Sequence, residues 1–593
     1  MKELEYPFDS AYILQKKKSI RRQLLTNPDL LEKKVAILSG STVGEAKNIL
    51  ELFLLHHGIK PEFWEGQYNR FYEEAVWGDP GLISFAPDIV YIHTSNRNIE
   101  EYPAPGEPSE AVQARAEAVY ARFRQAWDAV RERLHCPVIQ NNLEDPPCRP
   151  LGNSDAVSPS GGVHYVNTIN RMFHEYAQTG AGVYINDLHY QASWFGLERW
   201  YDNAQWYMYK YPFAVDAIPF VAHNVANIVK SVFGKNKKAL VLDLDNTLWG
   251  GVIGDDGVEN IRLGIETPEG MAYRDFQKYI KALAAAGISL NVCSKNDEAI
   301  ALQGLEHPSG VLKRNDFIVF KADWNNKDRN ISETAEILNI LPDSMVYVDD
   351  NPAERALAAA SLPGLAVPEI KTPEDYMRIL DQSGYFEVTA LSADDRKRNE
   401  YYKANARRME DQNRFTDYAE YLRSLEMVCS LEPFGEANLQ RVTQLINKTN
   451  QFNLTTRRYT EEEVREYSRL QGHITISVRL QDKYGDNGLV SVLMAGTNGG
   501  IAEIDLWVMS CRVFKRELEL AVFDELVRQC RQLDVSKIRG IYNRTSKNAL
   551  VEELYGALGF SAVQRDEGRG EWEYVIPEVY ETMNRVMEVR LND

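Results

Sequence analysis

A short apolar run that ends in two carboxylates is the feature that most constrains this chain. Residues 239–242 (ALVL) are followed at once by DLDNT, in which Asp243 and Asp245 are the acidic positions. Such a run predicts a buried strand, and the acidic residues predict a polar tip at its C-terminal end. Asp and Asn also favour ordinary turns. The rest of the sequence must therefore decide between a turn and a functional site.

The same pattern of a strand followed by polar residues recurs twice downstream. It appears in ISLNVCSKND (288–297) and in SMVYVDDNPAER (344–355), with helical segments between them. Strands that alternate with helices predict a parallel sheet, whose C-terminal strand ends share one edge. We expect seven polar residues to meet Asp243 and Asp245 at that edge: Cys293, Ser294, Lys295, Asn296, Lys327, Asp349 and Asp350.

A group of carboxylates at one sheet edge is unfavourable unless a cation neutralises it. Mg²⁺ suits such a group, because it prefers oxygen ligands and retains waters that a phosphate can displace. Lys327 can balance phosphate charge, and the Ser294 hydroxyl can donate a hydrogen bond to it. An aspartate beside Mg²⁺ can also attack phosphorus. The pattern therefore predicts Mg²⁺-dependent phosphate chemistry.

The ordered motifs DLDNT, CSKN, the lysine of WNNKDRN, and VDDN resemble the haloacid dehalogenase superfamily of phosphotransferases. By this resemblance, Asp243 is the nucleophile and Asp245 the general acid/base. The resemblance implies a metal site formed by Asp243, Asp245, Asp349 and Asp350, with the backbone carbonyl of Asp245 as one ligand. It implies phosphate binding by Thr247, Ser294, Lys295, Asn296 and Lys327. Few residues precede the next helix, so we expect a minimal cap and access for a large or protein-borne substrate.

Longer stretches of the sequence narrow the resemblance to one branch of this superfamily. LVLDLDNTLWGGVIGDDG, FQKYIKALAAAGISLNVCSKND, DWNNKDRNI and VYVDDNPAER look like the FkbH-like branch of the superfamily. That branch serves polyketide-type pathways, and its better-understood members take D-1,3-bisphosphoglycerate, remove phosphate and transfer a glyceryl group to an acyl carrier protein. The implied cofactors are Mg²⁺ and the carrier's phosphopantetheine as acceptor. The implied partners are the carrier and a phosphorylated three-carbon substrate.

Cys293 is the candidate acyl acceptor in that scheme. A thiolate can take an acyl group from an acyl phosphate as a thioester, and Lys295 could lower the pKa of the thiol. Neighbouring strand residues point to opposite faces. If Ser294 faces the site, Cys293 faces the core, where small cysteines commonly pack. The sequence leaves both interpretations open.

We expect three α/β or α+β domains. Residues 1–217 form an SGNH- or flavodoxin-like α/β domain, and residues 218–385 form the haloacid-dehalogenase Rossmann-like parallel sheet. Residues 386–593 form a GNAT-like α+β domain. A linker is expected over residues 368–395.

The C-terminal region resembles GNAT acetyltransferases in RTSKNALVEELYGALGF (544–560), where Asn548 and Tyr555 occupy matching places. Its phosphate-binding turn departs from that family, because Lys515 and Glu517 stand where glycines let backbone amides grip pyrophosphate. A carrier's pantetheine arm is a candidate ligand, as is a purely structural role. The candidate contacts to a carrier or its arm are Arg457, Arg458, Arg512, Lys515, Asn548 and Tyr555.

The N-terminal region resembles SGNH hydrolases more distantly. Ser41 follows the first strand, Asn141 and Asn142 follow a later one, and Asp187 and His189 come late. The sequence has GST and DLH in place of the usual motifs. We expect a non-catalytic domain that docks a partner, with a hydrolase based on Ser41 and His189 as the alternative.

The charge balance and cysteine content exclude several classes of protein. The formal net charge is −19, which argues against binding to nucleic acid or to an anionic membrane. Six cysteines without a CxxC pair argue against a zinc site and indicate a reducing, cytoplasmic location. Two alternatives to glyceryl transfer remain: a phosphatase acting on a sugar or another phosphoester, and a carrier-binding scaffold with little catalysis.

Overall fold

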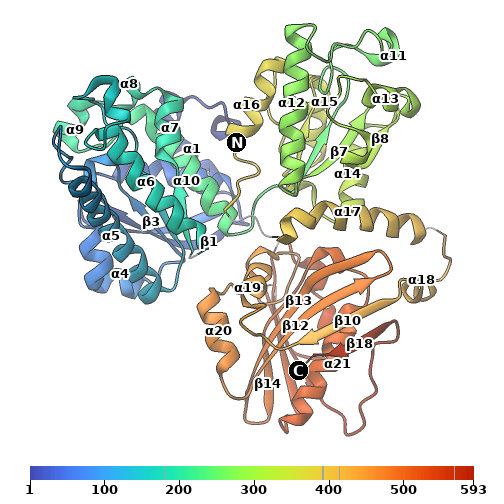
Figure 1. The fold of residues 1–593 in the computed structure, drawn as a ribbon. Helices are drawn as coiled ribbons and strands as arrows, with labels where there is room; N and C mark the ends of the chain where they lie inside the picture. Colours follow the sequence, from blue (N-terminus) through green and yellow to red (C-terminus); the bar gives the residue numbers. More distant parts are fainter. Residues whose placement is uncertain (181, 390–392, 413, 546, 567, 593) are drawn as a thin grey trace. The chain divides into compact units, whose positions relative to one another are not determined.

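The computed structural model describes residues 1–180, 182–389, 393–412, 414–545, 547–566 and 568–592. It divides into two compact units, whose helices and strands are labelled in Figure 1. The first contains residues 1–233 with 387–389, and the second contains residues 234–386 with the chain from residue 393 onward. Each unit is described by itself below. None of the described helices is both long and apolar enough to cross a membrane.

The first unit is built on a parallel five-stranded sheet with the order β2-β1-β3-β4-β5. This order is that of a flavodoxin-like doubly wound fold. Its strands are β1 (Leu31–Ser39), β2 (Ile59–Glu65), β3 (Ile89–His93), β4 (Val138–Asn141) and β5 (Val183–Asn186). The expected fourth strand, 182–190, is shorter than predicted, because Asp187 instead caps helix α7.

Helices cover both faces of this sheet, and each face carries its own apolar core. α1, α2 and α10 pack on one face, and α5 and α6 pack on the other. The helices are α1 (Ser10–Leu24), α2 (Gly44–His56), α3 (Phe71–Glu73), α4 (Pro80–Phe85), α5 (Ser109–Leu134), α6 (Gly162–Gln178), α7 (Leu188–Phe195), α8 (Leu197–Trp200), α9 (Asn203–Tyr209) and α10 (Ile218–Val232).

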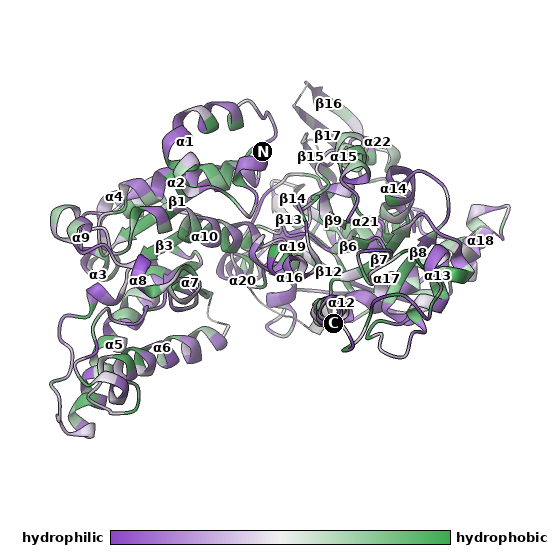
Figure 2. Cartoon of the chain, turned by 90° about the horizontal axis from the view of Figure 1, so that it is seen from above, coloured by the Kyte–Doolittle hydropathy of each residue, from purple (hydrophilic) through white to green (hydrophobic). Residues whose placement is uncertain are grey.

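Helix α10 corrects the first predicted domain boundary. It is apolar on most sides, and Val221, Val225 and Val229 are buried against residues of α2 in the N-terminal core. The first unit therefore ends after Phe233 rather than after residue 217. Figure 2 shows mostly hydrophobic residues along the strands of the first unit, and both hydrophilic and hydrophobic residues along its helices.

The second unit begins with a parallel four-stranded sheet of the order β8-β7-β6-β9. Its strands are β6 (Ala239–Leu242), β7 (Ser289–Ser294), β8 (Phe317–Ala322) and β9 (Met345–Val348). The helices are α11 (Ile253–Asp256), α12 (Pro268–Ala285), α13 (Glu298–Leu305), α14 (Lys327–Leu338), α15 (Pro352–Ser361) and α16 (Pro373–Gln382). α16 lies within the predicted linker, and its Tyr376, Ile379 and Leu380 pack into the core.

The remainder of the second unit contains a mixed sheet with the order β16-β17-β15-β14-β13-β12-β10-β18, and β11 pairs with β14 outside that path. Its strands are β10 (Met427–Glu432), β11 (Phe452–Asn453), β12 (His473–Asp482), β13 (Gly485–Asn498), β14 (Ile501–Met509), β15 (Lys537–Asn543), β16 (Ser561–Arg565), β17 (Arg569–Val575) and β18 (Met587–Leu591). Its helices are α17 (Ala393–Gln412), α18 (Tyr418–Ser424), α19 (Leu439–Lys448), α20 (Glu461–Arg469), α21 (Leu518–Gln532) and α22 (Leu554–Ala557).

Candidate active site

The polar ends of β6 and β9 lie side by side. Leu242 pairs with Val348 in the parallel register, so Asp243 and Asp349 follow at neighbouring strand ends. The backbone N–H of Asp243 donates to the carbonyl of Val348 at 3.0 Å. The sheet therefore brings together two carboxylates that are about a hundred residues apart in the sequence.

Asp350 joins these two residues in a compact acidic cluster. One carboxylate oxygen from each of Asp243, Asp349 and Asp350 lies within 4.8 Å of the others. Asp349 is fully buried and Asp243 is nearly so. The Oδ1 atom of Asp243 is buried and has no hydrogen-bond partner among the described residues. A hard cation satisfies such an oxygen, so the cluster fits a Mg²⁺ site.

Lys327, the first residue of α14, supplies a positive charge beside the cluster. Its Nζ lies 3.1 Å from Asp243 Oδ2 and 2.5 Å from Asp349 Oδ2. Burial alone would lower the pKa of Lys327, but the two carboxylates outweigh burial and raise it. Burial raises the pKa of Asp243, and Lys327 opposes that rise. Lys327 therefore stays protonated and partly balances the cluster.

Asp349 is held by groups that the sequence did not single out. The hydroxyl of Tyr347 and the Nζ of Lys327 donate to its Oδ2, and the backbone N–H of Asn351 donates to Oδ1 at 2.7 Å. The guanidinium of Arg355 donates to the carbonyl of Asp349 at 2.6 Å. These bonds fix the Asp349 carboxylate in position. Tyr347 could have been found from its place two residues before Asp349 on the same strand face.

Asp245 is held apart from the acidic cluster. Its Oδ1 accepts from Trp249 Nε1 at 2.9 Å and from the N–H of Ile253 at 3.1 Å, and its Oδ2 accepts from Asn296 Nδ2 at 3.0 Å. The Asp245 carboxylate therefore lies outside the group of three, and the backbone carbonyl of Asp245 stays the predicted metal ligand. Burial raises its pKa, which suits a group that donates a proton.

Three of the predicted phosphate-binding residues differ in their surroundings. Ser294 is buried, and its side chain opposes the rise in the pKa of Asp243. The Thr247 hydroxyl accepts from the backbone N–H of Asp350 at 3.3 Å. Lys295 instead pairs with Glu354 of α15 at 2.6 Å. Ser294 and Thr247 therefore adjoin the acidic cluster, whereas Lys295 is engaged by a different carboxylate.

Cys293 is buried beneath the site. It is 0% exposed and packs with Val241, Ile331 and Tyr347 in an apolar core. Its Sγ donates to the carbonyl of Lys327 at 3.6 Å, and burial raises the pKa of the thiol. The prediction that Lys295 lowers this pKa is wrong. Strand alternation is the reason, because it turns Cys293 to the packed face of β7.

The segment between β6 and α12 forms only a small cap. It contains α11 and an isolated antiparallel bridge between Gly250 and Arg262. Trp249 and Ile253 from this segment are buried in the core of the sheet. The cap therefore serves mainly to fix Asp245.

The N-terminal sheet does not assemble a hydrolase triad. Asp187 accepts from Asn142 Nδ2 at 2.7 Å and from the N–H of Tyr190 at 3.1 Å, so it caps α7. His189 Nδ1 lies 3.8 Å from Asp145 Oδ1 instead of facing Asp187. The Ser41 hydroxyl is buried, with no hydrogen-bond partner among the described residues. These positions do not support the hydrolase alternative.

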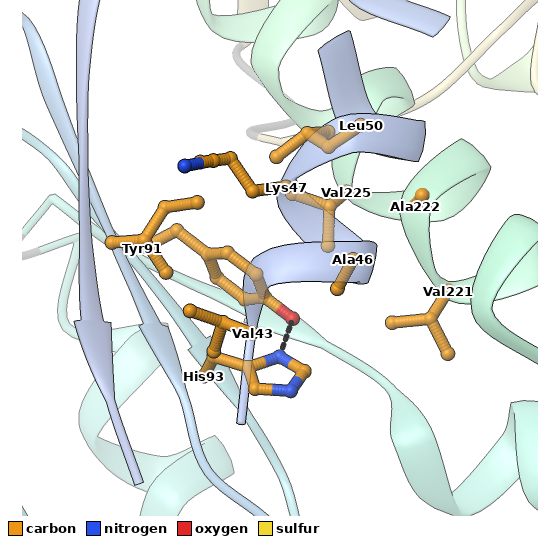
Figure 3. A pocket seen from close by; sticks show the side chains of 10 residues that line it. Val43, Ala46, Lys47, Leu50, Tyr91, His93, Val221, Ala222 and Val225 are labelled. Atoms are coloured by element: carbon orange, nitrogen blue, oxygen red, sulfur yellow. Dashed lines mark hydrogen bonds between the residues drawn. The ribbon is translucent and has the colours of Figure 1, made fainter. Parts of the chain in front are cut away.

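A small cavity adjoins this sheet between α2 and α10 (Figure 3). It measures about 10 Å³ and is lined mainly by apolar side chains such as Val43, Leu50 and Val225. Tyr91 and His93 share a hydrogen bond at its wall, and burial lowers the pKa of His93 to about 4. The cavity reaches only the lower limit for one water molecule, so it is a packing gap.

A third segment of the chain joins strands β14 and β15 in the C-terminal region. β14 and β15 are parallel and pair directly only over residues 501–504 and 537–540. Beyond that point the chain's own segment 452–455 lies between them. Leu454 N–H donates to Trp507 O, and Asn543 N–H donates to Leu454 O at 2.8 Å.

The candidate contacts in this region are mostly occupied. Asn548 is buried and donates to the carbonyls of Asn453 and Asn543 at 2.9 and 2.8 Å. Tyr555 is 0% exposed and packs on Gly540. Burial lowers the pKa of Arg458 to about 10, and its guanidinium donates to Asn450 Oδ1 at 2.5 Å. Asn548, Tyr555 and Arg458 are therefore engaged by the chain's own groups, and their contact with a carrier stays a prediction.

The other three candidate contacts are more accessible. Arg457 is exposed and pairs with Asp505 at 2.8 Å. Lys515 is exposed and Arg512 is half-buried. Lys515 and Glu517 have φ values of 62° and 60°, the left-handed conformation that glycine adopts most readily. The turn thus keeps a glycine-like backbone at two positions that carry side chains.

A family model and a solved structure match large parts of this chain. Residues 34–230 match the N-terminal domain of FkbH. The N-terminal part of the protein BF1531 from Bacteroides fragilis, a structure that contains a phosphatase domain and was solved with Mg, is 30% identical. The match covers 64% of this chain and 99% of that one, with a TM-score of 0.59.

Matches in the C-terminal region are much weaker. The ribosomal-protein-S18-alanine N-acetyltransferase from Escherichia coli is 11% identical, covering 26% of this chain and 99% of that one, with a TM-score of 0.21. Ard1 from Thermoplasma volcanium is 14% identical, covering 25% and 99%, with the same TM-score. At these low identities and TM-scores, the likenesses support no statement about the C-terminal region. No curated protein matches the chain.

Proposed function

Since the chain belongs to the FkbH-like family and carries a haloacid-dehalogenase-type phosphatase domain, we propose that it dephosphorylates D-1,3-bisphosphoglycerate and passes the glyceryl group to an acyl carrier protein. The buried, unbonded Oδ1 of Asp243, beside Lys327 and two further carboxylates, is the observation that carries the phosphate chemistry. Transfer to a carrier rests on the family resemblance.

The acidic cluster has the donor set for Mg²⁺. Asp243, Asp349 and Asp350 would hold the ion, which neutralises phosphate charge when it is bound. Lys327 adds a fixed positive charge at the same place. The chain's own contribution is to position Asp243 next to the phosphorus atom.

Asp243 and Asp245 divide the phosphoester step between them. An Asp243 oxygen forms a bond to phosphorus as the ester P–O bond breaks, and the departing alkoxide takes a proton from Asp245. Water then attacks the aspartyl phosphate, giving its proton to Asp245 and releasing phosphate. Trp249, Ile253 and Asn296 hold Asp245 in a fixed orientation throughout.

The acyl step joins the glyceryl carbonyl carbon to sulfur and releases the second phosphate. The carrier's pantetheine thiol is the proposed nucleophile, because the thiol of Cys293 is buried and its pKa is raised. The thiol proton leaves with the phosphate or with solvent. Direct transfer therefore replaces the cysteine relay that the sequence suggested.

Exposed apolar side chains near the strand ends favour a protein-borne acceptor. Val252 follows β6 and is 40% exposed, and Trp324 follows β8 and is 77% exposed. Large exposed apolar residues frequently mark contact surfaces. We expect Trp324→Ala to raise the KM for the carrier several-fold while phosphate release from the small substrate stays unchanged.

A mass-spectrometric assay tests the proposal. The protein is mixed with Mg²⁺, D-1,3-bisphosphoglycerate and a holo carrier protein, and both proteins are weighed. We expect a glyceryl adduct on the carrier, and no glyceryl adduct when Asp243→Asn is used, because that variant leaves the phosphoester in place. Phosphate release without any adduct would favour the alternative of a phosphatase on another phosphoester. Full carrier binding with no phosphate release would favour a scaffold.

Cys293→Ala separates direct transfer from a cysteine relay. We expect this variant to keep both phosphate release and carrier acylation. Cys429→Ala, which removes another fully buried thiol, is the matched control for the loss of packing. Direct transfer is refuted if Cys293→Ala alone abolishes acylation while phosphate release continues.

A further inference from the structure

A second cavity lies within the second unit, away from the acidic cluster. It measures about 150 Å³, an order of magnitude more than one water requires. Residues before β6 and β9 contribute to its wall, together with α17, α19 and the turn after β14. Several elements therefore combine to form a built cavity within this unit.

The lining of this cavity is strongly cationic. Of the described residues that line it, the only carboxylate is Asp343, and Lys547 pairs with it. The cationic lining residues are Lys238, Arg398, Arg441, Lys448, Arg512 and Lys547. This concentration of charge is unusual in a chain whose net charge is −19.

Parts of this lining are already ordered. The Arg512 guanidinium lies 4.3 Å from the centre of the Tyr401 ring, and its Nε donates to Ser510 Oγ at 3.0 Å. The backbone N–H of Lys238 donates to Ser344 O at 2.7 Å. Because its guanidinium is already held, Arg512 loses little side-chain freedom on binding an anion.

The lowered pKa of a lysine near the cavity also indicates an excess of cations in this region. Burial and the charges of Lys547 and Arg458 lower the pKa of Lys235 to about 8, although Asp343 opposes that shift. Like charges that destabilise one another in this way attract an anion strongly when one is available.

The position of the cavity separates it from phosphate turnover. Lys238 and Ser344 precede β6 and β9, whereas Asp243 and Asp349 follow the same strands. The cavity thus lies toward the opposite edge of the parallel sheet from the acidic cluster. A ligand bound there does not reach the nucleophile.

We propose that this cavity binds a small polyanion through a diphosphate group. A diphosphate carries several negative charges in a small volume and accepts hydrogen bonds from many donors at once. Lys238, which precedes β6, and Arg512, which follows β14, provide such donors from two separate elements of the lining. This site is independent of the proposed glyceryl transfer.

Cys511 provides a local probe of occupancy. It lines the cavity and is half-buried, whereas Cys148 in the first unit is exposed, and the other four cysteines are buried. The full-length protein is treated with iodoacetamide in Mg²⁺-free buffer, and peptide mass spectrometry follows both thiols. We expect millimolar pyrophosphate to slow alkylation of Cys511 at least fivefold and to leave Cys148 unchanged.

Two variants and one control test the residues. Lys238→Gln and Arg512→Gln should each weaken pyrophosphate protection about tenfold, the loss expected for one charge-assisted contact. Lys278→Gln removes an exposed lysine on α12 and should leave protection unchanged. Equal weakening in all three variants would contradict the proposal, because it would indicate a general effect of net charge.

Sulfate at matched ionic strength separates binding from screening. Equal protection by sulfate and pyrophosphate would overturn the assignment of a diphosphate site. Phosphorus NMR of pyrophosphate provides a second measurement that does not need a reactive thiol. Line broadening that Arg512→Gln removes supports the site, and its absence overturns the proposal even if Cys511 reacts slowly.

Discussion

Two parallel sheets in this protein end in polar residues, but the residue types that meet at their ends differ. At the ends of β4 and β5, Asn186 donates to Asn141 Oδ1 at 2.7 Å, and Asn142 donates to Asp187 at 2.7 Å. At the ends of β6 and β9, carboxylates meet and Asp243 Oδ1 has no hydrogen-bond partner among the described residues.

The difference shows that a parallel sheet edge brings polar side chains close together. The types of those side chains then decide whether they can bind a cation and a phosphate. Amides donate and accept, so they satisfy one another when they are brought together. Ionised carboxylates only accept, so a group of them needs a lysine or a metal ion. The amides at the ends of β4 and β5 thereby satisfy one another, whereas the acidic cluster at the second sheet has the groups to bind a cation and a phosphate.

Substitution of the proposed nucleophile should give the largest difference between the two sheets. Asp243→Asn should lower the rate of phosphate release by at least about 1000-fold, because losing a covalent nucleophile removes the whole pathway. Ser41→Ala, the counterpart at the first sheet, should change the rate by less than about twofold. Steady-state phosphate release measures both. The contrast fails if Ser41→Ala is the more damaging variant.

Lys327 tests the balance of charge in the acidic cluster. Lys327→Met should lower kcat/KM about 100-fold, because a fixed positive charge at the phosphate is lost. It also leaves two buried carboxylates unpaired. Added Mg²⁺ should therefore raise the Tm of this variant more than that of the native protein. Lys321→Met, which breaks the partly exposed pair with Glu333, is the control and should show neither effect.

Asp350 tests the metal site directly. Asp350→Asn should weaken Mg²⁺ binding about 10- to 100-fold, as measured by calorimetric titration of the metal-free protein. Asp255→Asn, at an exposed position in the cap, should leave the affinity unchanged. If Asp350→Asn binds Mg²⁺ normally, the acidic cluster is not the metal site.

Substitution of Glu144 should have a smaller effect, which is on the pH dependence of stability in the first unit. Burial raises its pKa to about 7, with only partial relief from the backbone, Arg97 and Trp200. Because the folded-state pKa is higher than the unfolded value, Glu144 supports stability at low pH and loses that contribution as the pH rises through 7. Glu144→Gln should be about 1–3 kcal/mol more stable than the native protein at pH 8 and similar at pH 5.

Denaturation followed by the fluorescence of the buried Trp127 and Trp200 measures this effect in the first unit. The native protein should lose stability between pH 5 and pH 8 by more than Glu144→Gln does. Parallel pH profiles for the two proteins would show that Glu144 is ionised in the folded state at both pH values.

The sequence predicted the central sheet because its signals are local. ALVL followed by DLDNT, and MVYV followed by DD, each place a short apolar strand directly before acidic residues. Parallel pairing then places those residues together without knowledge of any side-chain contact. Lys327 was also predicted, since it follows β8 at the same edge.

Other parts of the site depended on contacts that local patterns do not contain. The direction of Cys293 depends on the face of β7, and the partner of Lys295 depends on where α15 packs. The cap of α7 by Asp187 changed an expected strand into a helix start. The run NKTNQFNLTTRRY has the composition of a polar loop, yet it contains β11, whose partners lie on strands far along the chain.

The position of β11 has a consequence for how the C-terminal sheet forms. Four residue pairs join β14 directly to β15, and segment 452–455 bonds both strands beyond them. Thr455 bonds to Asp505 and to Asn543, which are 50 and 88 residues away in sequence. Contacts of such long range form slowly. In a refolding experiment with pulsed hydrogen exchange, the amides of Leu454 and Asn543 should therefore become protected late and at the same rate.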